Sequence, residues 1–157
     1  YRERYSEIGW KENRVYDGVP EMLECLKKAG KRIYMATSKP EHFAKRIAEY
    51  FDFAKYFDVV CGASMDLLRY NKQQVVEYAL SLAGVALDAE GKVPKDAGVL
   101  MVGDRHHDVE GAGALGIKTL GVTYGFGTGE ELISSGAICI VDSPEKVAEL
   151  IISDKVK

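Results

Sequence analysis

Two aspartates that stand four residues apart are the residues of this sequence best suited to hold a metal ion. Asp104 and Asp108 follow the apolar run 99–102, where a helix is expected to begin. Side chains at this spacing share one helix face, and Mg²⁺ typically takes one or two carboxylates together with water and substrate phosphate. In a simpler interpretation Asp104 caps the helix and Asp108 interacts favourably with the helix dipole. The spacing alone leaves both interpretations open.

Two hydroxyl side chains follow an earlier apolar run. Thr37 and Ser38 come after the run 33–36 and just ahead of a helix whose first turn holds Pro40 and Glu41. A hydroxyl group and free backbone N–H groups at a helix N-terminus can bind phosphate. Plain capping of the helix is the alternative, and this pair by itself favours capping.

A lysine is expected at the start of a further helix, over residues 72–83. Lys72 in the first turn opposes the helix dipole, which indicates that an anionic group lies nearby. Most surface lysines are only solvated charges, so this residue alone is a weak signal.

These side chains would be positioned by an alternation of apolar runs and amphipathic helices. Runs of strand length occur at 33–36, 59–61, 99–102, 119–122 and 138–141. Apolar runs separated by helices predict a parallel sheet covered on both faces, so the fold class is α/β, a doubly wound parallel sheet. Ligands of such sheets bind at the carboxyl ends of the strands, which is where the hydroxyl pair and the aspartate pair lie.

The bulk properties are those of an ordinary globular protein. The chain has 157 residues, of which 46% are apolar and 29% charged, and a formal net charge of −3. This charge favours neither nucleic acid nor an anionic membrane as a partner, and there is no membrane-spanning run or signal peptide pattern. Cys25, Cys61 and Cys139 lie far apart in apolar stretches, which predicts buried thiols in a reducing compartment, the cytoplasm.

Other motifs have simpler explanations than chemistry. The GxGxxG pattern at 111–116 lies inside a predicted helix and so favours close helix–sheet packing over dinucleotide binding. The glycine-rich segment 125–129 follows a strand and could border a site, but a flexible turn is the preferred interpretation. His106 and His107 are interpreted as variable positions rather than metal ligands, and His42 is expected to be exposed on a helix.

Taken together, the hydroxyl, the lysine and the acidic pair occur in an order that resembles the haloacid dehalogenase-like (HAD) hydrolase superfamily. The likeness is greatest to its phosphoglycolate phosphatase-like branch. It is carried by segments 34–40, 69–75 and 101–112, the last of which matches the family's GDxxxD pattern, and it runs from about residue 15 to the end.

The resemblance implies a role for each matching residue. Thr37, with Ser38 beside it, would bind the transferring phosphoryl group, and Lys72 would offset charge between phosphate and nucleophile. Asp104 would bind Mg²⁺ directly, while Asp108 would complete or orient that shell. The implied reaction is hydrolysis of a small phosphorylated metabolite through an aspartyl-phosphate. Phosphoglycolate, nucleoside monophosphates and sugar phosphates all remain admissible.

The family's nucleophile belongs to a DxD motif that would precede everything in this sequence. The resemblance therefore predicts a sheet that lacks its first strand, with a gap between the strands ending at Thr37 and Asp104, and most of the cap absent. Residues 1–16 would be the end of a helical cap and linker, and 17–157 the HAD-like core. The alternative is a non-catalytic HAD-like domain that keeps the fold and can still bind phosphate. Nothing in the sequence indicates an oligomeric state.

Overall fold

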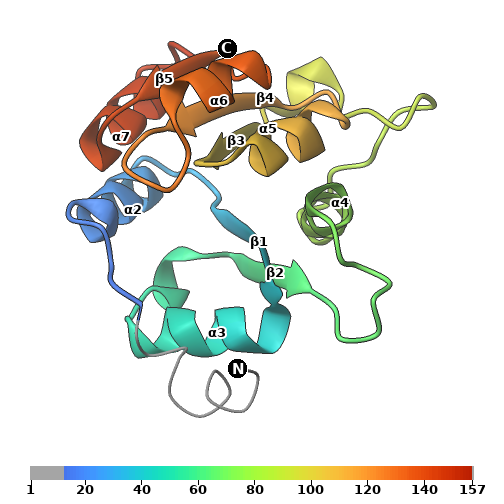
Figure 1. The fold of residues 1–157 in the computed structure, drawn as a ribbon, viewed down its shortest axis with the longest axis horizontal. Helices are drawn as coiled ribbons and strands as arrows, with labels where there is room; N and C mark the ends of the chain where they lie inside the picture. Colours follow the sequence, from blue (N-terminus) through green and yellow to red (C-terminus); the bar gives the residue numbers. More distant parts are fainter. Residues whose placement is uncertain (1–12, 157) are drawn as a thin grey trace.

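The computed structural model describes residues 13–156, in which helices alternate with parallel strands (Figure 1). The first half contains α2 (Val19–Lys28), β1 (Tyr34–Pro40), α3 (Glu41–Tyr50), the 3₁₀ turn η2 (Ala54–Tyr56), β2 (Val59–Ala63) and α4 (Lys72–Leu82). The second half contains η3 (Lys95–Ala97), β3 (Leu100–Gly103), α5 (His106–Gly113), β4 (Lys118–Val122), α6 (Gly129–Ser134), β5 (Cys139–Val141) and α7 (Pro144–Ile152).

The strands form two separate parallel sheets. In the first, β1 pairs with β2, and in the second β3, β4 and β5 lie in that order. In the described part of the chain no ladder joins β1 to β3. This is where the sequence analysis expected a gap, and the predicted α/β class with parallel strands is confirmed.

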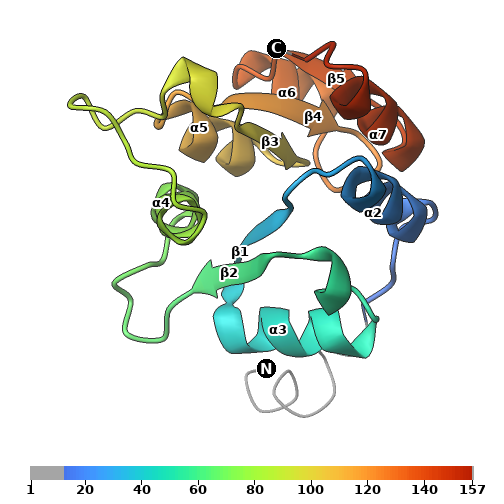
Figure 2. The ribbon, with the colours of Figure 1, turned by 180° about the vertical axis from the view of Figure 1, so that it is seen from behind.

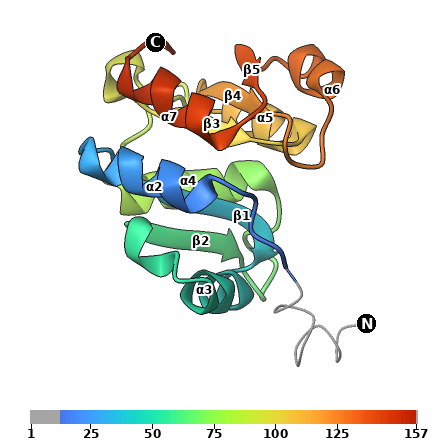
Figure 3. The ribbon, with the colours of Figure 1, turned by 90° about the vertical axis from the view of Figure 1, so that its left-hand side faces the viewer.

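The β1–β2 sheet is covered by a helix on each face because neighbouring residues of a strand point to opposite sides. Met35 and Val60, which are register partners, pack with the α3 residues Ala44 and Ala48. The next partners along, among them Cys61, pack against α4 instead. Figure 3 shows these two strands running between α3 and α4.

The three-stranded sheet is sandwiched in the same way. Leu120 and Val122 of β4 pack on Val147 of α7, and Met22 of α2 joins this cluster. The other face receives α5 and α6, with Gly121 of β4 close to Leu132 of α6. Helices α2 and α7 lie side by side in Figures 1 and 2, so the first helix of the described chain packs beside the last.

One apolar cluster joins the two sheets, and it lies beneath the site described below. Its buried members are Val76 and Leu80 of α4, Val93 of the loop between α4 and η3, Ala112 of α5, and Leu115 and Ile117, which follow α5. Ala36 of β1 and Met101 of β3 pack against this cluster from either side. The α4–α5 contact therefore substitutes for a ladder between the sheets and fixes the two strand ends relative to one another.

Local sequence signals explain most of the element boundaries. The Ser143 hydroxyl accepts the N–H of Lys146 at the start of α7, and Pro144 occupies the first turn, where its fixed φ suits a helix. Gly30 has φ +75° just past the end of α2, the left-handed conformation that a terminating glycine supplies.

The cysteines differ in burial. Cys61 is buried, but Cys25 is exposed, so the prediction of three buried thiols was wrong for Cys25, which lies on the outer face of α2.

Of the predicted cap end and linker at 1–16, residues 1–12 lie outside the described residues, and that boundary stays a prediction. Among residues 13–156, no helix has the length and apolar character needed to cross a membrane.

Candidate active site

The first residue of α4, Lys72, points into the molecule, and side-chain caps fix the start of its helix. The side-chain oxygen of Asn71 accepts the backbone N–H of Gln74 (2.9 Å), and the side-chain Oε1 of Gln74 accepts the backbone N–H of Asn71 (3.3 Å). This reciprocal capping box begins α4 at Lys72. From there the Lys72 ammonium reaches the carbonyl oxygen of Ala36 on β1 (2.8 Å) and Oδ1 of Asp108 on α5 (2.8 Å). The anionic group expected beside this lysine is thus a carboxylate from another helix.

Asp108 combines helix capping with the ion pair. Its Oδ2 accepts the backbone N–H groups of Asp104 and Arg105, both at 3.1 Å, while Oδ1 faces Lys72. The Asp108 and Lys72 side chains are only 11% and 12% exposed. Charge-assisted bonds shielded from water in this way hold both side chains in one geometry. Asp108 therefore positions the ammonium group and the turn that carries Asp104.

Asp104 does not cap α5, and its carboxylate turns toward the glycine-rich segment. Oδ2 accepts the N–H of Phe126 at 2.8 Å. A Cβ atom at Gly125 or Gly127 would collide with the side chain or backbone carbonyl of Asp104, so only glycine allows this approach. Segment 125–129 therefore borders the acidic turn and packs closely around Asp104.

Thr37 and Ser38 lie within β1, not at the start of α3. Pro40 is the N-cap of α3 and no side chain caps that helix, so the capping alternative is wrong for both residues. The Thr37 hydroxyl accepts the N–H of Lys39 (3.2 Å), and Thr37 lines a pocket of about 260 Å³. Ser38 is exposed, and both residues lie where the β1–β2 register shifts, between Ala36 and Pro40.

The structure thus brings four of the five candidate residues to one edge. Lys72 and Asp108 are in direct contact, Asp104 is joined to Asp108 through its backbone N–H, and Thr37 directly follows the Ala36 carbonyl that Lys72 binds. No contact joins Ser38 to this group among the interactions of residues 13–156.

Comparison with known proteins gives this arrangement its context. A family profile for haloacid dehalogenase-like hydrolases matches residues 1–116. The chain belongs to this family. It therefore shares the Rossmann-like HAD core, in agreement with the parallel sheets found here.

Individual relatives agree with this assignment. A 5'-nucleotidase of Pseudomonas aeruginosa is 42% identical over 132 residues (84% of this chain and 56% of that protein). The tyrosine-protein kinase PtkA of Mycobacterium tuberculosis is 37% identical over 150 residues (96% and 48%), and a phosphoglycolate phosphatase of Vibrio parahaemolyticus 31% over 150 residues (94% and 60%).

A solved structure described as a predicted phosphatase from Clostridium acetobutylicum superposes on the chain with a TM-score of 0.88. It is 38% identical, and the match covers 98% of this chain and 67% of that one. This HAD chain spans about half the length of the curated relatives it matches.

The HAD core holds its acidic turn with a second carboxylate that the sequence analysis missed. Glu131 Oε1 accepts hydrogen bonds from the guanidinium Nε–H of Arg105 (3.0 Å) and from the backbone N–H of His106 (2.9 Å). The same oxygen lies 2.8 Å from His106 Nδ1. The backbone and side-chain hydrogen bonds from His106, then the bond from Arg105, lower the pKa of Glu131 to about 2. The T-x-x-E pattern at 128–131 was a visible signal, since the Thr128 hydroxyl accepts the Glu131 N–H (3.1 Å).

A second missed group fixes the connection ahead of Lys72. The Arg69 guanidinium donates to the carbonyl of Gly62 (2.8 Å) and to Glu41 Oε2 (2.8 Å), and it lies 3.8 Å from the ring centre of Tyr78. Burial raises the pKa of Glu41, but hydrogen bonds from Lys45 and the Gly62 N–H outweigh burial and hold it below its usual value. This cluster ties the end of β2 to α3 and α4.

The half-buried phenol of Tyr124 also affects the electrostatics beside the acidic turn. Burial, followed by the negative charge of Asp104 and the neighbouring Tyr16, raises the pKa of Tyr124 to about 12. The two tyrosine rings meet edge to face at 5.7 Å. Tyr124 therefore stays neutral near Asp104 and adds no charge to the site.

The carboxylate set is chemically suited to a hard divalent cation. In the described part of the chain, the hydrogen bonds of Asp104 engage Oδ2 and leave Oδ1 for a metal, whereas Asp108 uses both oxygens. Oxygen ligands and few protein carboxylates are typical of Mg²⁺ sites. Asp104 would accordingly be the direct ligand and Asp108 the residue that orients it.

Proposed function

We propose that the complete protein is a Mg²⁺-dependent phosphatase that hydrolyses a small phosphate monoester through an aspartyl-phosphate. The nucleophilic aspartate would lie outside these 157 residues. The observation that carries the proposal is the shielded Lys72–Asp108 pair, which holds an ammonium group beside the end of β1 and next to the acidic turn. Such preorganised charge is the main requirement of phosphoryl transfer.

Each candidate side chain has a task in this reaction. Lys72 would neutralise charge between the phosphoryl group and the attacking carboxylate, and the Thr37 hydroxyl or the backbone beside it would bind a phosphoryl oxygen. A Mg²⁺ ion held by Asp104 would supply further neutralisation of the phosphoryl oxygens. Asp108 would keep Lys72 and the acidic turn in place. Within residues 13–156 no contact joins Ser38 to the other four candidate residues. A role for Ser38 in binding phosphate would therefore depend on parts of the complete protein outside these residues.

The names of the relatives narrow the substrate class. A 5'-nucleotidase and phosphoglycolate phosphatases are among them, so nucleoside monophosphates and phosphoglycolate are the first substrates we propose to test. The relationship to PtkA favours a second candidate, in which a tyrosine hydroxyl takes the place of water as phosphoryl acceptor. We also propose a cytoplasmic location, because Cys25, Cys61 and Cys139 are all unpaired thiols.

Replacing Asp104 tests the proposal. Asp104→Asn in the complete protein should reduce Mg²⁺-dependent turnover by about a hundredfold or more, because the amide removes the charge that attracts the ion. Asp96→Asn, an exposed aspartate in η3, is the matched control and should leave turnover unchanged. Circular dichroism would verify that both variants fold.

The same panel distinguishes the alternatives. Near-normal turnover of Asp104→Asn at ordinary Mg²⁺ would refute the metal role. Dehalogenation of a haloacid that persists after a chelator has removed the metal would identify a dehalogenase. Phosphate transfer to tyrosine would identify a kinase. No turnover of any phosphate ester by the complete wild-type protein would leave the non-catalytic HAD-like domain as the correct description.

A further inference from the structure

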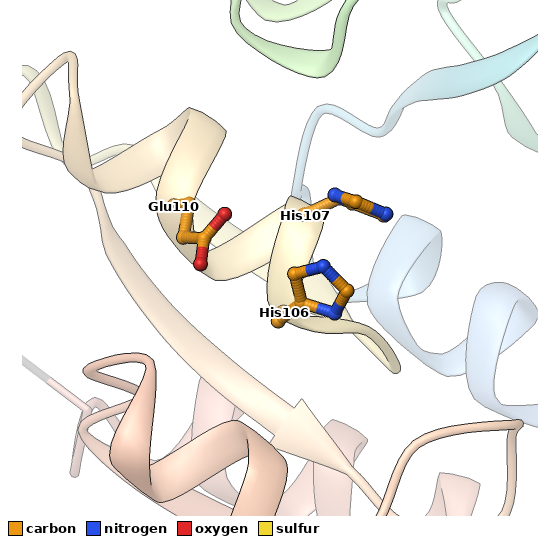
Figure 4. A group of neighbouring side chains, drawn as sticks. All are labelled: His106, His107 and Glu110. Atoms are coloured by element: carbon orange, nitrogen blue, oxygen red, sulfur yellow. The ribbon is translucent and has the colours of Figure 1, made fainter.

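A second group of possible metal ligands lies on α5, apart from Asp104 and Asp108. His106, His107 and Glu110 each offer one ligand atom, and these atoms all lie within 4.8 Å of one another. Figure 4 shows His106 and His107 at the start of α5 and Glu110 about one turn further along the helix. Residues three and four positions apart share a helix face, which places this group on a different side of α5 from the buried Asp108.

His106 is oriented in the way that metal-binding histidines usually are. Its Nδ1 lies 2.8 Å from Glu131 Oε1, and the same oxygen accepts the His106 backbone N–H. A carboxylate against one ring nitrogen places the proton there, fixes the ring and leaves the lone pair of the other nitrogen, Nε2, for a metal. Glu131 comes from α6, so the orientation is imposed by the tertiary fold and not by the helix alone.

The surrounding charges are compatible with a bound cation. The N-terminus of α5 opposes a positive ion, but Glu110 and Glu131 bring two carboxylates to the group. Arg105, which precedes the group in the chain, is paired with Glu131 at 3.0 Å. His107 and Glu110 are exposed and His106 is half-buried, so an ion from solution can reach all three side chains.

We propose that His106, His107 and Glu110 bind a divalent transition-metal ion of the Zn²⁺ or Ni²⁺ class, with Glu131 as the residue that positions His106. Imidazole ligands select such ions, whereas carboxylate and water ligands suit Mg²⁺. Three protein ligands leave a coordination position open for water or a small ligand. The site is separate from Asp104, and it does not depend on the phosphatase activity proposed above.

The test uses the complete protein, stripped of metal and kept in excess Mg²⁺ so that the Asp104 site is not available. Zn²⁺ is then titrated in competition with a chromophoric chelator, which reports affinity without any enzymatic readout. We expect one Zn²⁺ site that is lost in His107→Ala and weakened in Glu110→Gln. Glu131→Gln should weaken the binding about 10- to 100-fold, as for other residues that orient a ligating histidine.

Two variants serve as controls. His42→Ala removes the third histidine of the chain, which is exposed on α3, and Asp104→Asn removes the proposed Mg²⁺ ligand; both should retain the Zn²⁺ site. Absence of Zn²⁺ binding by the wild-type protein would overturn the proposal. So would binding that persists in His107→Ala, which would point to a thiol or another site, and binding that disappears in Asp104→Asn, which would show that Zn²⁺ only replaces Mg²⁺.

Discussion

At the scale of single residues, the Lys72–Asp108 pair accounts for placements that look unfavourable in isolation. A lysine in the first turn of α4 opposes the helix dipole, but here its ammonium is bonded to the Asp108 carboxylate and the Ala36 carbonyl. Removing one partner of a pair shielded from water costs more than the pair contributes, because the remaining charge is left without compensation.

We therefore expect Lys72→Met to destabilise the protein by about 3 kcal/mol. Lys146→Met is the control, because the Lys146–Asp142 pair is 55% and 67% exposed and such pairs contribute about 0–1 kcal/mol. Urea unfolding at neutral pH measures both changes. Equal effects of the two substitutions would show that burial does not strengthen the Lys72 pair.

Glu131 gives the acidic turn a pH dependence with a definite sign. Its pKa in the folded protein is about 2, below the ordinary value of 4.5. The stability that Glu131 contributes is therefore fully present above about pH 4.5 and is lost as the pH falls from there toward 2.

Melting temperatures of the wild type and Glu131→Gln should accordingly differ at pH 7 and converge toward pH 3. Glu130→Gln, an exposed neighbour, controls for the loss of one negative charge. A difference that stays constant between pH 7 and pH 3 would contradict the ionised role of Glu131 in holding Arg105 and His106.

At the scale of elements, the contact between α4 and α5 depends on a residue without a side chain. A Cβ atom on Gly111 would lie 2.8 Å from Cγ and 2.9 Å from Cβ of Lys72, and 3.0 Å from the backbone nitrogen of Gln73. The first glycine of the GxGxxG pattern thus serves close helix packing, and it does so beneath the lysine of the site.

Gly111→Ala and Gly113→Ala should consequently have opposite effects. Alanine within a helix is favoured over glycine by about 0.5–1 kcal/mol, and Gly113 has no neighbouring atom within 4 Å of an added Cβ, so Gly113→Ala should stabilise. At Gly111 the collision with α4 should outweigh this gain and cost about 1–3 kcal/mol, with a matching loss of turnover in the complete protein. Thermal unfolding checks the sign, and stabilisation by both substitutions would refute the close-packing argument.

At the scale of the whole molecule, the two sheets are joined by side chains and not by a hydrogen-bonded ladder. The cluster around Leu115 receives Ala36 from β1 and Met101 from β3, and Leu115 itself is 1% exposed. Cohesion between the sheets in residues 13–156 therefore comes from this apolar cluster together with the packing of α2 beside α7.

Leu115→Ala should cost about 2–5 kcal/mol, the usual effect of emptying a buried leucine site. Leu82→Ala, at the end of α4 and 47% exposed, should change stability by about 0.5 kcal/mol or less. Far- and near-ultraviolet circular dichroism should follow one common transition in urea. Separate transitions in the wild-type protein would show that the sheets unfold independently.

Much of this protein was determined by the sequence alone. In the described part of the chain, the apolar runs predicted the five strands to within a few residues, because strands buried on both faces must be apolar throughout. The positions of Asp104, Asp108 and Lys72 made them candidate site residues, but their spacing alone left capping and solvated charge as alternatives. The serine followed by proline at 143–144 is also a local pattern typical of a helix start, because the capping partners lie within one turn.

Only the tertiary structure decided how those residues divide the work. The open alternative was that Asp104 caps α5 and Asp108 only interacts with the helix dipole. In the structure Asp108 is the capping residue, and Asp104 turns to the loop of Gly125 and Gly127 that follows β4. The Glu131–His106 contact likewise joins residues 25 positions apart. Periodicity and spacing report on neighbours within a helix turn or strand, whereas contacts between distant segments arise only when the sheets and helices pack.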